Sequence, residues 1–349
     1  MRVILFDFIQ GIVYMIIKNL TLLLLTLTTS LAFGQTISLD STYPPLGQLV
    51  NIGERKLHIL CSGKGSPTIV LVAGAGAFSI DWNLVQSRID STTRVCSYDR
   101  AGLGWSDSGY AEETVEETVS DLHKLLRAAG EKPPYILVGA SIGGIFIQAY
   151  QHTFPKEVAG LVFTNSSNQI GFAAKSRTDL IWNLTEDEIR SSYPFPPSTD
   201  NSSMLTKVVE PFDRLPPDLQ PIRLWLTIRL QEKWNKSIPN PESTLSWRKE
   251  FLREFNESDA VKPNFPLGKL PVVVVDSDPR VNDSLRYSRD GAAARLDYLS
   301  SNSTHITTPE SGHEIHLYQP DAVVSSLKMI ISAIRENIPL PIIKDKTKK

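Results

Sequence analysis

The sequence predicts an α/β fold: a mostly parallel central sheet with helices on both faces, plus an inserted, mainly helical cap. Three observations support this fold class. Short apolar runs without polar alternation recur along the chain, as in strands that are buried on both faces of a sheet. Segments of helical periodicity separate these runs. A stretch from about residue 170 to 265 interrupts the alternation, as an insertion would.

Seven segments predict the strands of this sheet. The segment TIVLVAG, at 68–74, is apolar and ends in glycine, as a parallel strand buried on both faces does. The segment LPVVVVDSD, at 270–278, is rich in β-branched residues, which favour strands. In chain order the predicted strands are 56–61, 68–74, 93–99, 135–139, 158–165, 270–278 and 303–310.

Three segments between or after these strands predict helices. The segment EETVEETVSDLHKLLRAAG is amphipathic and ends at Gly130. Its apolar face consists of Val115, Val119, Leu122, Leu125 and Leu126. The segment IGGIFIQAYQHTFP predicts a helix that stops at Pro155, and PDAVVSSLKMIISAIREN predicts an amphipathic helix that closes the chain.

The predicted core is in two parts, at 45–169 and 266–338, and the cap is the insertion at 170–265. The cap is rich in proline and holds four of the six tryptophans, including Trp182 and Trp225. These two side chains are expected either to line a substrate pocket or to form a small core within the cap.

Both ends of the chain lie outside the predicted fold. Residues 1–34 contain Lys18, an apolar run and a small-residue site that ends at Gly34, which is the pattern of a signal peptide; Met15 is an alternative start. We expect an exported protein, periplasmic or secreted, with no stable membrane span after cleavage. An uncleaved N-terminal anchor is the alternative. Residues 339–349 form a basic tail, expected to be solvated.

Composition gives little reason to expect a charged partner. Hydrophobic residues make up 41% of the chain and charged residues 21%, a normal globular balance. The formal net charge of -2 does not favour nucleic acid or an anionic membrane. The expected partner is therefore a small molecule.

The stretch GASIGG, at 139–144, lies between a predicted strand and a predicted helix. It contains Gly139-x-Ser141-x-Gly143, the pattern of a strand-to-helix turn that holds a nucleophilic serine. Such a turn strains the serine backbone, and side chains at the flanking glycines would collide with neighbouring elements. The pattern alone is weak, and its place between strand and helix is what favours Ser141 as a nucleophile.

A serine nucleophile needs a histidine base, and the base needs a carboxylate that fixes its tautomer. Among six histidines, His313 follows the last predicted strand in a loop, with His316 as its rival. The acid is expected between serine and histidine in the chain. Of Asp276, Asp278 and Asp283, Asp278 is favoured because it precedes a proline, and Asp276 remains an alternative.

The glycine-rich loop AGAGAF, at 73–78, is expected to complete this site. The backbone N–H groups of Ala75 and Ile142 would bind the oxyanion. Gly74 and Gly76 would let the backbone approach the substrate closely. Neither phosphate-loop pattern is present, and HEIH is not H-E-x-x-H, so no cofactor and no metal are predicted.

Together, five stretches resemble the α/β-hydrolase superfamily over about residues 45–335. They are LVAGAGAFSIDW, RVCSYDRAGLGWSD, PYILVGASIGG, LPVVVVDSD and SGHEIHLYQPD. The resemblance implies the serine hydrolase branch, because the superfamily's haloalkane dehalogenases and epoxide hydrolases use an aspartate where Ser141 stands. Through its G-H-x(6)-P ending it also selects His313 over His316, and it supports Asp278.

Three further implications follow from the resemblance. It makes Asp99 and Arg100 structural residues of the site floor. Ala73-Gly74 replaces the family's usual His-Gly and leaves the backbone donors in place. Asn165 stands where relatives sometimes carry the acid, and an amide cannot supply that charge.

The resemblance also bears on the two cysteines. The superfamily's strand order places the second strand, which ends in Cys61, beside the fourth, which contains Cys96. Adjacent strands are about 4.8 Å apart, which is compatible with a disulfide if the residues are level. A disulfide and two buried free thiols both remain open.

The predicted function is a serine hydrolase that cleaves carboxylic esters of small or medium size through a Ser-His-Asp triad and an acyl-enzyme. An aminopeptidase or amidase of the same fold is one alternative, with an amide as substrate. A non-catalytic binding protein on the same fold is the other.

Overall fold

The structure is a computed structural model of the 349-residue chain. It describes residues 43–108, 115–166, 207–230, 267–277, 300–309 and 311–343, and the backbone of 173–174, 180–181 and 231–237. Thr42–Lys349 forms one compact unit. The predicted signal peptide at 1–34 and most of the predicted cap lie outside the described residues.

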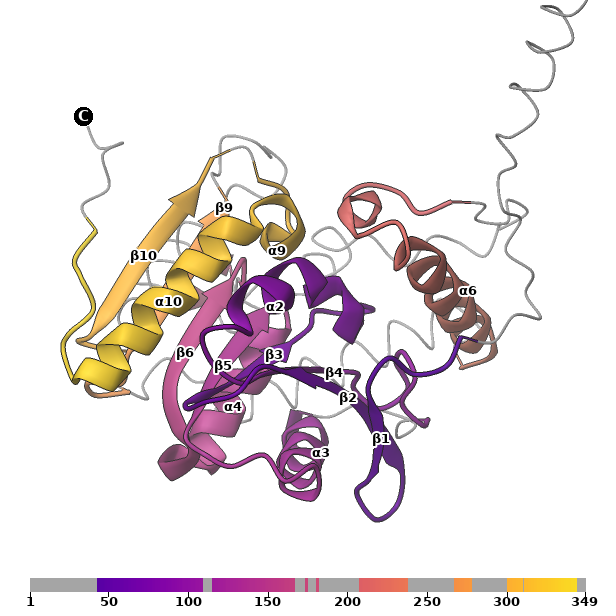
Figure 1. The fold of residues 1–349 in the computed structure, drawn as a ribbon, viewed down its shortest axis with the longest axis horizontal. Helices are drawn as coiled ribbons and strands as arrows, with labels where there is room; N and C mark the ends of the chain where they lie inside the picture. Colours follow the sequence, from indigo (N-terminus) through magenta and orange to yellow (C-terminus); the bar gives the residue numbers. More distant parts are fainter. Residues whose placement is uncertain are drawn as a thin grey trace, which may run out of the picture. The chain divides into compact units, whose positions relative to one another are not determined.

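An eight-stranded sheet forms the centre of this unit, in the order β1-β2-β4-β3-β5-β6-β9-β10 (Figure 1). Strands β4 to β10 in this order are parallel, whereas β1–β2 and β2–β4 are antiparallel. The strands are β1 (Gln48–Asn51), β2 (Lys56–Ser62), β3 (Thr68–Val72), β4 (Val95–Tyr98), β5 (Tyr135–Ala140), β6 (Val158–Thr164), β9 (Val272–Ser277) and β10 (Ser303–Thr308). A short pair, β7 (Ala173–Ala174) with β8 (Leu180–Ile181), stands apart from this sheet.

The predicted mostly parallel sheet is confirmed. All seven predicted strands form, each within two residues of its predicted ends, and β1 is an additional strand. The four valines of β9 show why the apolar runs predicted buried strands. Val272 and Val274 join the core on one face of the sheet, and Val273 and Val275 join the core on the other.

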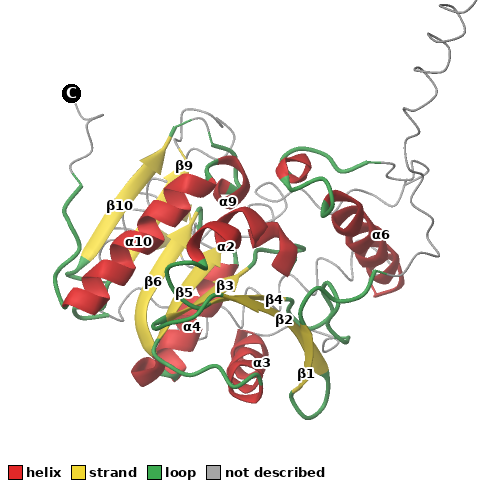
Figure 2. Ribbon diagram, viewed as in Figure 1, coloured by secondary structure: helices red, strands yellow, loops and turns green. Residues whose placement is uncertain are grey.

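Helices cover both faces of the sheet (Figure 2). One face packs on α3 (Val115–Ala128) and α4 (Gly143–Thr153), and the other on α2 (Asn83–Ile89) and α10 (Pro320–Glu336). The five predicted apolar residues of α3 are all buried. Gly130 follows that helix at φ 76°, a left-handed conformation that suits glycine at a helix end.

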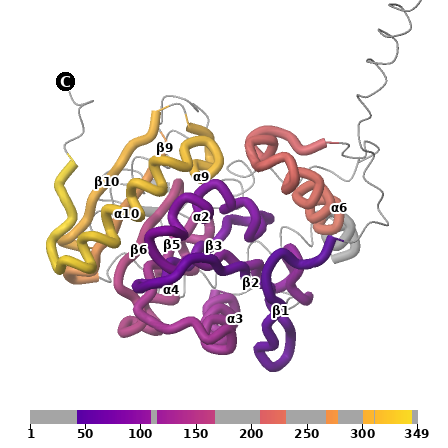
Figure 3. Tube along the Cα trace, in the orientation of Figure 1, coloured from indigo at the N-terminus to yellow at the C-terminus, as the bar shows by residue number. Residues whose placement is uncertain are grey.

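A third apolar cluster lies between α6 (Gln220–Ser237) and the core. It joins α6 to segments from three other parts of the chain: η2 (Ser79–Trp82), the loop that holds Trp105, and α9 (Ile315–Tyr318). In Figure 3 helices α2 and α9, which are far apart in the sequence, lie side by side. Helix α6 lies within the predicted, mainly helical cap and also packs on the short η4 (Phe212–Arg214).

None of the helices in the described part of the chain has both the length and the apolar character needed to cross a bilayer.

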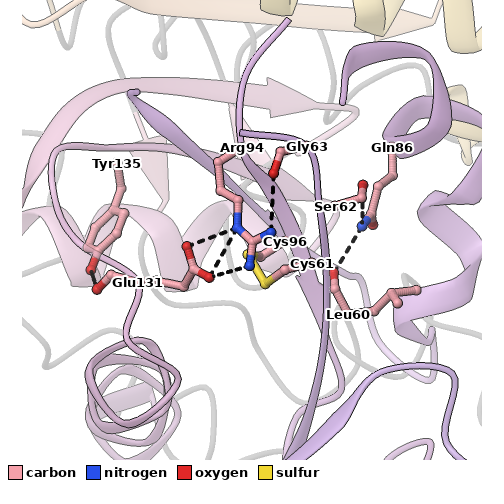
Figure 4. Close-up of a disulfide and its surroundings, with 9 residues drawn as sticks. All are labelled: Leu60, Cys61, Ser62, Gly63, Gln86, Arg94, Cys96, Glu131 and Tyr135. Atoms are coloured by element: carbon pink, nitrogen blue, oxygen red, sulfur yellow. Dashed lines mark hydrogen bonds and ion pairs between the residues drawn. A yellow bond between two sulfur atoms is a disulfide. The ribbon is translucent and has the colours of Figure 1, made fainter. Parts of the chain in front are cut away.

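A disulfide joins Cys61 and Cys96 (Figure 4), which resolves the choice between a disulfide and free thiols. The two residues are direct partners in the register of β2 and β4, with a Cα–Cα distance of 4.1 Å. Beside the sulfurs, Arg94 and Glu131 form an ion pair at 2.7 Å. The hydroxyl of Tyr135 donates a hydrogen bond to the Glu131 carbonyl at 2.9 Å.

We predict that replacing both cysteines by serine lowers the free energy of unfolding by about 3–4 kcal/mol, because the disulfide restricts the unfolded chain over a separation of 35 residues. Urea denaturation of the wild type and the double variant measures this difference. Reductant should destabilise the wild type and leave the variant unchanged. Equal stabilities of the wild type and the variant would contradict the prediction.

Candidate active site

Ser141 occupies a sharp turn between the end of β5 and the start of α4. Its backbone is left-handed, with φ 52°, which is rare outside glycine and costs roughly 1–3 kcal/mol. The Ser141 N–H donates to the carbonyl of Thr164 at 3.3 Å, and the Ser141 carbonyl accepts from the Gly144 N–H at 3.1 Å. The turn thus lies at the carboxyl ends of the parallel strands, with its strained serine half-buried.

The three glycines around Ser141 are required by close approach of the backbone. A Cβ on Gly139 would lie 2.6 Å from the carbonyl of Gly143, and one on Gly143 would lie 2.4 Å from the carbonyl oxygen of Val72. A Cβ on Gly144 would lie 2.5 Å from Cβ of Ser166, which follows β6. The collisions predicted at the flanking glycines are therefore confirmed, and Gly144 lets α4 pack closely on the sheet.

The loop after β3 lies directly beside Ser141. A Cβ on Gly74 would be 3.2 Å from Cβ of Ser141. The buried guanidinium of Arg100 donates hydrogen bonds to the carbonyls of Ala73 at 2.6 Å and Gly74 at 3.0 Å. These two bonds fix the position of the loop. Among the described residues, the N–H groups of Ala75 and Ile142 have no hydrogen-bond acceptor. Both amides are therefore available to an oxyanion.

Asp99 holds the neighbouring loop after β4. Its carboxylate accepts hydrogen bonds from the backbone N–H groups of Ser79 at 2.6 Å and Trp105 at 3.2 Å. The same carboxylate lies 2.8 Å from Nδ1 of His58, and both side chains are fully buried. A Cβ on Gly104 would collide with it at 2.2 Å. Asp99 therefore organises the loops around the site from within the core.

His313 lies in the loop between β10 and α9 and is half-buried. Its carbonyl accepts a hydrogen bond at 3.0 Å from the amide of Asn165. Asn165 is the next residue after Thr164, whose carbonyl binds the Ser141 N–H. The backbones of the Ser141 turn and of the His313 loop are thereby linked through the end of β6.

His316, the rival to His313, is buried in α9. Its ring stacks on Trp82 with 4.4 Å between ring centres. Desolvation by burial, together with the nearby His313 and Arg223, lowers the pKa of His316 to about 3. His316 therefore stays neutral at ordinary pH and is a poor proton acceptor.

The alternative acid, Asp276, is already paired. Its carboxylate lies 3.0 Å from Nε2 of His305 on the neighbouring strand β10. The hydroxyl of Thr308 donates to the Asp276 carbonyl at 3.0 Å. Asp278 and Asp283 lie outside the described residues.

Helix α6 is fastened over these loops by a buried ion pair that the sequence did not indicate. Nε of Arg223 lies 2.6 Å from Oδ1 of Asp81 in η2, and its guanidinium faces the rings of Phe78 and Phe212. Burial raises the pKa of Asp81, and Arg223 opposes that rise. Leu230 of the same helix lies beside Gly76: a Cβ at Gly76 would be 3.7 Å from the Leu230 side chain.

Of the two tryptophans named in the predicted cap, Trp225 lies within the described residues. Trp225 is 5% exposed and packs in the apolar cluster between α6 and the core. Its ring contacts those of Tyr43 and Trp105. Trp182 lies outside the described residues. Trp225 is therefore packed where α6 meets the rest of the core.

One group of potential metal ligands lies close together within the described ranges: Cys61, Cys96 and Glu131. Their ligand atoms are within 4.8 Å of one another. The two sulfurs are bonded to each other, and the Glu131 carboxylate is held by Arg94. This group is thus a disulfide beside an ion pair.

The chain matches the model of the alpha/beta hydrolase family over residues 69–326 and belongs to that family. The expected family and fold are therefore confirmed, and the protein is an α/β-hydrolase.

Relatives and solved structures are consistent with this assignment. A protein of Gibberella zeae described as an AB hydrolase superfamily protein is 24% identical over 301 residues, which is 77% of this chain and 87% of that protein. The meta-cleavage product hydrolase of Pseudomonas fluorescens IP01 has a TM-score of 0.55 at 16% identity, covering 81% of this chain and 96% of its own. A serine hydrolase involved in carbazole degradation has a TM-score of 0.56 at 21% identity, covering 82% and 98%. These structures show the shared fold.

We predict that His316 makes the protein less stable in acid. Its folded-state pKa lies below the value of 6.5 that it has when unfolded, so the unfolded state binds more protons between these values. The contribution is fully present above about pH 6.5 and is lost as the pH falls towards about 3, by up to about 1.4 kcal/mol per pH unit. Urea denaturation at several pH values should show a shallower acid slope in His316→Gln than in the wild type. Parallel slopes would contradict the prediction.

Proposed function

We propose that the protein is a serine hydrolase that cleaves carboxylic esters of small or medium size through an acyl-enzyme. The observation that carries the proposal is the left-handed backbone of Ser141 in a turn compressed between β3, β5 and β6. Backbone strain in a non-glycine residue is typical of functional sites. In this kind of turn the strain lets the serine side chain project above the sheet edge towards a substrate. The family assignment places the same turn within a hydrolase fold.

His313 is the proposed base that accepts the proton of the Ser141 hydroxyl and later returns it to the leaving group. Its loop is tied to the residue after Thr164, beside the nucleophile turn. The neutral, buried state of His316 supports the choice of His313. Asp278 is the proposed acid that orients the imidazole, and the pairing of Asp276 with His305 supports it over Asp276.

The N–H groups of Ala75 and Ile142 are the proposed donors to the oxyanion. Gly74 lies close to Ser141, and Arg100 binds the carbonyls of Ala73 and Gly74 in the same loop. Donors fixed before the reaction need no reorganisation as negative charge develops, which is why such sites stabilise a tetrahedral intermediate. Attack by Ser141 then gives an acyl-enzyme and releases the alcohol, and water attacks the acyl-enzyme with help from the same base.

The substrate is proposed to bind between this loop and the cap. Gly74 and Gly76 would allow close approach, and Trp182 and Trp225 are the proposed aromatic residues of the pocket, with Trp225 acting from the packed base of α6. The approach of Leu230 to Gly76 supports a cap that limits substrate size. An amide in place of the ester gives the aminopeptidase or amidase alternative.

Export to the periplasm or the exterior is proposed for the mature protein. The signal-like segment at 1–34 motivates the proposal. The disulfide between Cys61 and Cys96 supports it, because such bonds persist in oxidising compartments.

A fluorophosphonate probe tests the nucleophile. We expect covalent labelling of the wild type and none of Ser141→Ala, since the probe reacts with an activated serine. Gel fluorescence measures the labelling, and circular dichroism confirms that the variant is folded. A folded wild type that resists the probe would favour the non-catalytic binding protein. Matched p-nitrophenyl esters and aminoacyl arylamides then separate the esterase from the amidase.

The acid can be assigned by paired variants. Asp278→Asn should lower kcat for the best p-nitrophenyl ester by about 10³–10⁴-fold, because His313 loses the partner that fixes its tautomer. Asp276→Asn is the matched control and should retain kcat within about threefold of the wild type if only His305 depends on it. The reverse pattern would assign the acid to Asp276.

A further inference from the structure

Asn165 stands at the junction of the three segments from which the proposed triad is built. It is the first residue after β6, it is 3% exposed, and its φ is 44°. Its N–H donates to the carbonyl of Val275 in β9 at 2.8 Å. Thr164, just before it, accepts the N–H of Ser141. Each of two neighbouring strands is thus followed directly by a left-handed residue: Ser141 follows β5, and Asn165 follows β6.

The side-chain amide of Asn165 joins the other two segments. Its Nδ2 donates to the carbonyls of His313 at 3.0 Å and Gly312 at 3.3 Å. Its Oδ1 accepts from the Oγ of Ser277 at 3.2 Å and from the Ser277 N–H at 3.4 Å. Ser277 is the last residue of β9 and immediately precedes Asp278. One amide therefore joins the loop of the proposed base to the last residue of β9, which precedes the proposed acid in the chain.

The side-chain amide of Asn165 matches all four partners. Two carbonyl oxygens require two donors, and a backbone N–H with a hydroxyl requires an acceptor. The partners also fix the orientation of the amide, because the reverse would set its oxygen against two carbonyls. An aspartate has the same shape and retains the acceptor for Ser277, but it would turn a carboxylate oxygen towards the carbonyls of His313 and Gly312. A buried carboxylate oxygen that faces two carbonyl oxygens with no donor between them is costly.

We propose that Asn165 is a positioning residue that holds the His313 loop in register with the Ser141 turn and with the end of β9. This inference rests on the proposed function, because it takes His313 as the base. Asn165 acts through the backbone of its neighbours. Its loss changes the rate at which each folded active site reacts, since a displacement of about 1 Å in a catalytic group costs on the order of 100-fold in rate.

The test measures the rate of fluorophosphonate labelling per active site, together with the fraction of sites that are labelled at completion. In Asn165→Asp the rate constant per site should fall about 10- to 100-fold while most sites still become labelled. For the best p-nitrophenyl ester, kcat should fall in parallel and KM should stay within about threefold. A residue needed only for folding would lower the labelled fraction and leave the rate of the remaining sites unchanged.

Two further variants keep the test decisive. Asn165→Gly keeps the left-handed backbone and deletes all four side-chain bonds, so its rate per site should also fall if Asn165→Asp does not fold. Asn302→Asp is the matched control. Asn302 also bridges two segments, donating to the Lys269 carbonyl at 3.4 Å and accepting from the Leu340 N–H at 2.8 Å. Asn302 precedes β10, at the opposite end of the strand from His313. The labelling rate per site of Asn302→Asp should therefore match that of the wild type.

Wild-type rates per site in folded Asn165→Asp and Asn165→Gly would overturn the inference, as would an equal loss in Asn302→Asp. If the wild type itself is not labelled, the proposed function fails and the inference fails with it. A labelled wild type with unchanged Asn165 variants overturns the inference alone.

Discussion

The left-handed backbone at Ser141 is the constraint on which the rest of the site depends. The turn is possible only because Gly139, Gly143 and Gly144 carry no side chain where β3, β5 and the end of β6 press on it. Its strain, roughly 1–3 kcal/mol, is offset by the packing of α4 on a sheet that is buried on both faces. The packing of the whole core therefore maintains the strained residue. The loops around Ser141 must be held in fixed positions as well.

Buried polar groups fix those loops. Arg100 holds the carbonyls of the loop after β3, and Asp99 gathers N–H groups from two loops and the ring of His58. Asn165 joins the His313 loop to the end of β9. In each case a backbone group is bound by a side chain that cannot easily be replaced, because a buried polar group without a partner is costly. The site is thus built from an apolar sheet whose carboxyl edge is held by a few polar contacts.

Much of this arrangement follows from local patterns in the sequence. Apolar runs predicted seven strands, and the spacing of glycines around Ser141 predicted a turn that tolerates no side chains there. The amide network of Asn165 and the ion pair of Arg223 with Asp81 had no such pattern, because each joins residues more than 100 positions apart. Asn165 was predicted only as a residue that cannot be the acid. Its role needs both the fold and the direction of each hydrogen bond.

Trapping a covalent acyl intermediate on Ser141 tests the proposed mechanism most directly. An activated p-nitrophenyl ester should acylate Ser141 of the wild type faster than water deacylates it, so acyl-enzyme should accumulate in a burst at early times. Rapid quenching, proteolysis and mass spectrometry should then find the acyl group on the peptide that contains Ser141. Ester turnover by the wild type with no acyl group on that peptide, under any quench time, would contradict the account.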